Sequence, residues 1–394
     1  MGNKTLKNGL QKAKGYSKTV IQQVEKTIGP SEAKKLMREN LMFVKRENEV
    51  LFKYPGDLQG KQFKLENNKW CEIYIKDNNA GGFCDKWEDC IIFWGPSTSS
   101  VFIRDCKNCR FVIIWQQLRL RDCHNCEIML FSQTDPILES SSNIKYWWNN
   151  FSYPELQEQM DKWKISIWNN TWTDQYDFTA NSNKTNFQLI DEEAENFIES
   201  FDAITKNVML VQAQQVDPTI DQSQIDFIIE EEMQVPLIPI TTGSLPKEAQ
   251  YQAFVLFLDS DSSTVHQIYS FLYFEYFRGK RDQYWIKGKP KFIIIVETRQ
   301  VQLTDSQLGE VLNWDTSSQD YNDQFFEKAK GQILIGMHLC AAVDDGFSEK
   351  LAAYLSERHV DLDFYLSFSV SAVEVQSVKF FKEYNKDDKG QKME

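Results

Sequence analysis

The stretch CEIYI at residues 71–75 recurs along the chain as CIIF at 90–93, CRFVI at 109–113, CEIML at 126–130 and IKYW at 144–147. The spacing of about 18 residues falls near the range of stacked solenoid coils. Polar corners such as DCKN at 105–108 and DCHN at 122–125 precede the strands, and Asn and Asp suit corners because they tolerate left-handed backbone conformations. The repeat therefore predicts a parallel β-helix over residues 55–188.

The flanking sequence divides the rest of the chain. Residues 1–54 are basic at their start and predict a helical N-terminal extension, with a helix from about Ser17 to Asn48. Residues 189–249 are acidic and predict a connector. In residues 250–394, apolar strand runs at 254–258, 292–296, 333–339 and 364–368 alternate with helical patterns at 262–277 and 347–358, which predicts an α/β domain.

Composition narrows the classes of partner and compartment. The chain has 394 residues and a formal net charge of −13, which argues against a nucleic-acid partner because phosphate binding needs clustered positive charge. It contains neither an apolar run of about 18 residues nor the apolar core of a signal peptide. We expect a cytoplasmic protein whose cysteines are reduced.

The cysteines allow two interpretations. Cys106, Cys109, Cys123 and Cys126 have a spacing close to that of a four-thiolate zinc site. Cys109 and Cys126, however, occupy repeat positions that other coils also fill with cysteine, as buried side chains stacked inside a β-helix would. The repeat favours a cysteine ladder without a metal, and zinc is the alternative.

The N-terminus also has two interpretations. Gly2 fits the start of a myristoylation signal, but Leu6 stands where that signal wants Ser or Thr. Acylation together with the lysines nearby would bring this end to an anionic membrane as a peripheral contact. The alternative is a solvated tail.

One repeat strand carries the candidate functional residues. In the run WQQLRLRD at 115–122, strand alternation predicts that Leu118 and Leu120 point inward while Arg119 and Arg121 point outward. Arginine suits a phosphoryl-transfer transition state because its planar fork delocalises charge. Gln116 and Gln117 are long amides able to orient that fork or to contact a partner.

No catalytic motif accompanies the arginines. His124, His266, His338 and His359 have no nucleophile motif beside them, and a GxxxxGK[ST] loop is absent. We expect no active site and no cofactor of its own, so any chemistry the protein promotes belongs to a partner.

Several stretches resemble the tubulin-cofactor-C family, in order along residues 55–178: GKQF at 60–63, DCIIFWGP at 89–96, SVFIRDC at 100–106, QQLRLRDC at 116–123, TDPILESSSNI at 134–144, YPEL at 153–156 and SIWNNTWT at 166–173. A weaker resemblance reaches KFFK at 379–382. The resemblance as a whole implies a right-handed parallel β-helix followed by a ferredoxin-like domain. That domain is related to nucleoside diphosphate kinases, here without a counterpart of their catalytic histidine.

The resemblance also implies a GTPase-activating protein, acting on an Arf-like small GTPase or on tubulin, with GTP and magnesium carried by the partner. Arg119 falls on the arginine-finger position, Gln116 on a supporting glutamine, Glu139 on a carboxylate close to that arginine, and Phe178 on an aromatic contact to the GTPase. Arg121 shares the outward face and is assigned to partner binding. The expected setting is protein transport at the cilium or basal body.

A different class of function remains as the alternative. The N-terminal extension is unusual, and it would suit a structural or scaffolding component of cilia or axonemal microtubules that keeps the fold without the chemistry.

Overall fold

The computed structural model describes residues 40–190 apart from 150, 154 and 181–184. In the C-terminal half it describes residues 237–272 apart from 244 and 246–248, then 285–286, 289–290, 294–312, 319–341, 347–358 and 363–383 apart from 369, together with residues 219 and 223. Two compact units make up the chain: the first takes in the described residues up to 165 and from 171 to 238, and the second those at 166–170 and from 239 onward.

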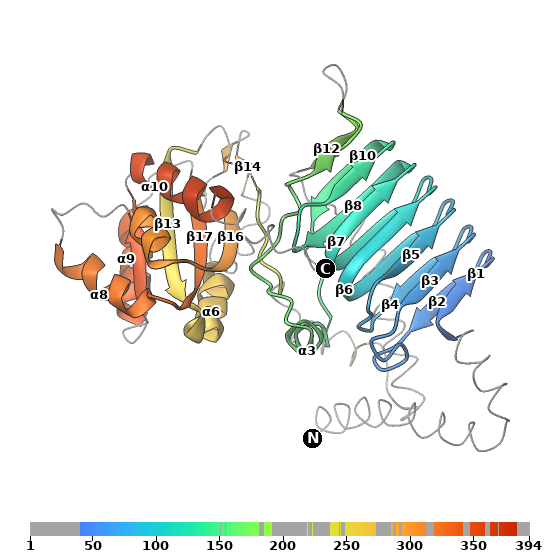
Figure 1. The fold of residues 1–394 in the computed structure, drawn as a ribbon, viewed down its shortest axis with the longest axis horizontal. Coiled ribbons are helices and arrows are strands. Elements are labelled where there is room, and N and C mark those ends of the chain that lie inside the picture. The colour runs from blue at the N-terminus through green and yellow to red at the C-terminus, as the bar shows by residue number, and fades with distance from the viewer. Residues whose placement is uncertain are drawn as a thin grey trace. The chain divides into compact units, whose positions relative to one another are not determined.

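The first unit is a parallel β-helix, whose strands Figure 1 shows stacked from blue β1 to green β12. The strands are β1 Met42–Val44, β2 Val50–Lys53, β3 Phe63–Glu66, β4 Glu72–Ile75, β5 Gly82–Asp85, β6 Ile91–Arg104, β7 Arg110–Arg121, β8 His124–Ser132, β9 Ile137–Glu139, β10 Ser142–Trp148, β11 Tyr176–Asp177 and β12 Phe187–Leu189. A short helix, α3 Leu156–Lys162, lies between β10 and β11. Every pairing among these strands is parallel.

The strands form two ladders. One ladder runs through β1, β3, β5, the C-terminal part of β6, the C-terminal part of β7, β9 and β11, and we call it the Arg119 ladder. The other runs through β2, β4, the N-terminal part of β6, the N-terminal part of β7, β8, β10 and β12. The long strands β6 and β7 belong to both, so they turn a corner without leaving the hydrogen-bonded sheet.

The polar corners behave as their residue types predict. Asp105, Asn108, Asp122 and Asn125 all have φ between 53° and 56°. Asn and Asp adopt this left-handed conformation at lower cost than most residues do. The side-chain amide of Asn125 also donates to Asn108 at 3.3 Å, so successive corners are joined.

Apolar and thiol side chains fill the interior of the β-helix. Cys71, Cys90, Cys109 and Cys126 recur from coil to coil and are all buried. Large aromatic rings also fill the interior, as where Trp94 meets Trp115 edge to face with centroids 5.1 Å apart. The predicted parallel β-helix is confirmed.

The predicted N-terminal helix is wrong at its C-terminal end. Residues 42–44 and 50–53 are strands, and β1 and β2 pair with β3 and β4, so the β-helix extends to Met42 rather than beginning at residue 55. The Lys- and Glu-rich composition favours a helix locally, but pairing with the neighbouring coil hydrogen-bonds the backbone and buries Leu51, which overrides a propensity of a few tenths of a kcal/mol per residue. Residues 1–39 of the expected extension lie outside the described part of the chain.

The second unit has a four-stranded antiparallel sheet in the order β16-β17-β13-β18. Its elements are β13 Tyr251–Leu258, α6 Ser262–Leu272, β16 Ile294–Gln302, α7 Asp305–Val311, α8 Gln319–Ala329, β17 Ile333–Ala341, α9 Phe347–Arg358, β18 Phe364–Ser367 and α10 Val370–Ser377, which continues into a π-helical turn at Val378–Glu383; the short pair β14 Trp285–Ile286 and β15 Lys289–Pro290 precedes β16. With α6 between the first two strands of the sheet and α9 between the last two, this is the ferredoxin-like arrangement, as expected.

Local sequence explains how the helices of this unit begin and where they pack. Thr304 caps α7: its hydroxyl accepts from the Gln307 amide, and the Gln307 side chain accepts from the Thr304 amide. One face of the sheet then packs against α7, α8 and the C-terminal helix in a cluster that includes Phe254, Leu308 and Phe380. No helix in the described residues is long and apolar enough to cross a membrane.

Candidate functional site

The strand alternation predicted around Arg119 is confirmed. Leu118 and Leu120 are buried in the β-helix interior, whereas Arg119 is half-buried and Arg121 is exposed. The two arginines therefore share the outer face of the Arg119 ladder.

Register between coils arranges the outward side chains of this ladder in two rows. The first row consists of Phe83, Phe102, Arg119, Ile137 and Tyr176, one from each successive strand. The second row consists of Asp85, Arg104, Arg121 and Glu139. Parallel strands lie about 4.8 Å apart, so the closest side chains on the adjacent strands are the neighbours in the same row.

Arg119 is held by neutral groups. Its Nε donates to Gln117 Oε1 at 2.9 Å. The same oxygen accepts from the Ser100 hydroxyl, also at 2.9 Å. The guanidinium carbon lies 5.5 Å from the centroid of the Phe102 ring, within the range of a cation–π interaction.

The residues expected to support Arg119 take different positions in the structure. Gln116 is exposed, and its backbone carbonyl accepts from the amide and hydroxyl of Thr134, each at 3.0 Å, so the contact to Arg119 comes from Gln117 instead. Glu139 stands opposite Arg121 in the register and not opposite Arg119. The side chain that orients the Arg119 fork is thus an amide on the same strand, since residues two apart share a face.

Arg119 differs in charge pairing from the other described arginines of this unit. Arg46 pairs with Glu49 at 2.6 Å, and Arg110 pairs with Glu127 at 3.2 Å. Arg104 makes two bonds of 2.7 Å to Asp85, and Arg121 lies 3.3 Å from Asp122. Arg119 alone in this set has no carboxylate partner among the described residues, and its side chain lies on the outer face of the ladder.

Exposed aromatic rings follow Arg119 along the face. Tyr176 and Phe178 are 57% and 63% exposed, and their rings meet edge to face with centroids 4.6 Å apart. Strand β11 holds them there: Tyr176 is in register with Ile137, and the Phe178 amide donates to the Leu138 carbonyl at 2.9 Å. Exposed rings on the same face as an outward guanidinium are what a protein partner would contact.

Phe102, Ser100 and Tyr176 were not predicted as site residues from the sequence. Aligning SVFIRDC at 100–106 with QLRLRDC at 117–123 places Ser100 against Gln117 and Phe102 against Arg119, as the structure does. The repeat thus contained the signal for Ser100 and Phe102. Tyr176 is separated from Ile137 along the chain by β10 and α3, so the 18-residue spacing of the repeat does not predict its place in the row.

The cysteines form ladders inside the β-helix. Cys84 and Cys106 lie with their sulfurs 4.0 Å apart, and the Cys71 amide approaches the Cys90 sulfur at 3.5 Å. Burial raises the pKa of both Cys84 and Cys126 to about 12, which keeps these thiols protonated. Within the described residues, no group of three or more His, Cys, Asp or Glu side chains is placed to hold a metal ion.

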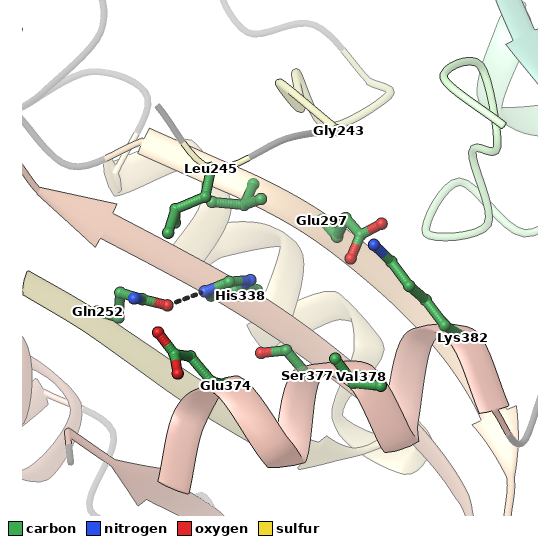
Figure 2. Close-up of a pocket in the computed structure, with 10 residues that line it drawn as sticks. Gly243, Leu245, Gln252, Glu297, His338, Glu374, Ser377, Val378 and Lys382 are labelled. Carbon is green, nitrogen blue, oxygen red and sulfur yellow. Dashed lines mark hydrogen bonds between the residues drawn. The ribbon is translucent and has the colours of Figure 1, made fainter. Parts of the chain in front are cut away.

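The second unit contains a small cavity of about 170 Å³ between the sheet and α10, shown in Figure 2. His338 Nε2 lies 2.9 Å from Gln252 Oε1, and burial, reinforced by the charge of Lys382, lowers the pKa of His338 to about 4. Glu297 and Lys382 point toward each other at one side. Ligand pockets usually measure about 300–1,000 Å³, so this cavity is a weaker candidate than the Arg119 face.

Gly2, the expected acylation site, lies outside the described residues. The structure brings several of the predicted site residues together. Arg119, Gln117 and Phe178 lie on the Arg119 ladder, and Arg121 and Glu139 stand opposite each other on adjacent strands of it.

The first unit is similar to known proteins. Residues 60–178 match the family model described as tubulin binding cofactor C. Protein XRP2 of Danio rerio is 28% identical over 297 residues, which cover 75% of this chain and 71% of the relative. Protein XRP2 of Homo sapiens is 33% identical over 156 residues, which cover 40% of this chain and 45% of the relative.

Two further matches carry the family's name or a related one. Tubulin-specific chaperone C of Homo sapiens is 27% identical over 157 residues, covering 39% of this chain and 45% of the relative. Among solved structures, tubulin binding cofactor C from Leishmania major covers 30% of this chain and 82% of that chain, with 19% identity and a TM-score of 0.26. The family match falls on the coils that carry Arg119, so residues 60–178 are similar to the tubulin binding cofactor C family.

Proposed function

We propose that the β-helix unit activates GTP hydrolysis on an Arf-like small GTPase by presenting Arg119 as an arginine finger. The observation that carries the proposal is that Arg119 has no carboxylate partner among the residues that the structure describes. The other described arginines of this unit have a carboxylate partner, whereas Arg119 is held by an amide oxygen and a ring. A positive group kept in place without a counter-ion suits an anionic target on a partner.

The chemistry requires little more from this chain. In GTP hydrolysis the transition state spreads negative charge over the phosphoryl oxygens, and a guanidinium stabilises that charge through its planar fork. GTP and magnesium belong to the GTPase. Fingers of this kind raise the rate by about 10³ to 10⁵, which corresponds to roughly 4 to 7 kcal/mol of barrier.

Single-turnover hydrolysis of GTP by purified Arf-like GTPases tests the proposal. Wild-type protein accelerates hydrolysis, Arg119→Ala abolishes nearly all of the acceleration while retaining much of the binding, and Arg119→Lys recovers little because lysine lacks the planar fork. Arg110→Ala, which removes an exposed arginine from the same strand, is the matched control and keeps the acceleration. Equal rates for wild type and Arg119→Ala would reject the finger.

Tubulin is the second candidate partner, favoured by the similarity to tubulin-specific chaperone C. The same variants assayed for GTP turnover by tubulin decide between the two. The ciliary and membrane-peripheral setting is tested by fractionation: release of the protein from cilia by detergent supports a membrane-associated regulator. Retention on salt-washed axonemes would instead support a scaffolding component.

A further inference from the structure

We propose that Phe102 and Ser100, one coil before Arg119, are positioning residues that hold the arginine ready before a GTPase binds. The inference rests on the proposed function and adds two residues to it. It follows from two contacts to one guanidinium: the Phe102 ring under its central carbon and a hydrogen bond at its Nε.

The Phe102 ring is itself held by the ring of the preceding coil. Phe102 is in register with Arg119 and stacks on Phe83 of the preceding coil, with centroids 5.7 Å apart and ring planes 20° apart. The stack restricts the orientation of the Phe102 ring and therefore that of the guanidinium above it. A free arginine side chain has many rotamers, and ordering it in advance lowers the cost of ordering it when the partner binds.

Ser100 supports Arg119 indirectly, through hydrogen bonds that meet at Gln117. Ser100 is in register with Gln117, and its hydroxyl donates to Gln117 Oε1. That oxygen also accepts from Arg119 Nε. Because the bond uses only Nε, no hydrogen bond to a described residue occupies the terminal Nη groups, which remain available to phosphoryl oxygens.

Arg104 also lies over a phenylalanine ring, but its guanidinium is occupied by a carboxylate. Its guanidinium carbon lies 5.4 Å from the Phe83 centroid, much as Arg119 lies over Phe102. Asp85, however, takes both its Nε and one Nη with bonds of 2.7 Å. Arg104 stands opposite Asp85 in the register and reaches Phe83 diagonally, whereas Arg119 stands opposite Phe102 itself. Of these two arginines, Arg119 is the one whose fork has no carboxylate on it among the described residues.

Single-turnover kinetics of the full chain with a responsive GTPase test the positioning. We expect Phe102→Leu and Ser100→Ala each to lower the maximal stimulated rate by about 3- to 10-fold while changing the half-saturating concentration less than twofold. Phe102→Trp restores the rate because it keeps a ring face. Phe52→Leu, the same change at a half-buried ring that stacks on Tyr74, is the matched control and has no effect.

A readout in the protein alone separates this inference from the proposed function. In a ¹⁵N spectrum of arginine Nε–H groups, assigned with Arg119→Lys, the Arg119 signal should be shifted from its random-coil position by the Phe102 ring and should exchange slowly with water. Phe102→Leu removes the shift, and Ser100→Ala speeds the exchange.

The outcomes are distinct. A wild-type protein that stimulates no GTPase contradicts the proposed function, and the spectrum still reports whether Arg119 is held. A random-coil Arg119 signal in the wild type overturns the positioning. So does full stimulation by both Phe102→Leu and Ser100→Ala.

Discussion

Replacing Ile137 with aspartate places a carboxylate beside Arg119 and so tests whether the unpaired charge of this arginine matters. Ile137 is in register with Arg119 on the adjacent strand β9, and its side chain is only partly buried. Ile137→Asp would thus give Arg119 an acidic neighbour of the kind that the other described arginines of the unit already have.

The size of the effect follows from the spacing of the strands. Neighbouring strands lie about 4.8 Å apart, which puts the charges roughly 6 Å from each other. At that separation the attraction is about 0.7 kcal/mol in water and about 3 kcal/mol near a protein surface. This energy must be given up when the finger engages an anionic transition state, so the stimulated rate should fall by about 3- to 100-fold.

Ile137→Asn is the matched control, because asparagine has the shape of aspartate and loses the same apolar contact. Both variants are compared by single-turnover GTP hydrolysis at low salt and at about 1 M salt, where charges are screened beyond about 3 Å. The aspartate variant should be slower than the asparagine variant at low salt, and the gap should narrow at high salt. Equal rates at low salt would refute the reasoning that a free charge on Arg119 drives activation.

Further predictions concern the packing and titration of buried groups. Gly336→Ala places a Cβ 2.3 Å from the Phe380 ring and should lower the stability of the second unit by about 1–3 kcal/mol, with part recovered by adding Phe380→Leu; urea titration of β17 amide signals checks this. His338 has its folded-state pKa lowered to about 4 from 6.5, so the unfolded chain binds more protons between these values. The stability of that unit should therefore fall by up to about 3 kcal/mol as pH drops from 6.5 to 4, and His338→Gln should flatten the same titration. Cys84, with its pKa raised to about 12 from 9.0, should be alkylated by iodoacetamide at pH 8 roughly 1,000-fold more slowly in the folded protein than in urea, as followed by mass spectrometry.

Much of the architecture was predictable because its signals are local. The recurrence of short apolar segments and of Asp or Asn corners, as at Asp105 and Asn125, reports coils that each repeat the same backbone path. Alternation along one strand separates Leu118 from Arg119, since successive side chains point to opposite faces. In the second unit, apolar runs and helical periodicity located the strands and helices for the same reason.

Prediction failed where a neighbouring coil decided the outcome. Residues 42–53 have a helical composition, yet they pair with the next coil because the exposed end of a β-helix offers unpaired backbone groups. For the support of Arg119 the sequence offered both Gln116 and Gln117, and the structure gives the contact to Gln117, which shares its face.

The sequence by itself determined the coil repeat, the inward and outward faces, and the presence of an outward arginine at position 119. Tertiary structure decided which side chains contact that arginine and which strands follow it in its row, as with Ile137 and Tyr176. Its row neighbours Phe102 and Ile137 come from other coils, and coil lengths and bulges in the hydrogen-bonded ladder set which residues meet. Glu139 consequently faces Arg121, and no carboxylate in the described part of the chain pairs with Arg119, because pairing across coils depends on register and not on sequence distance.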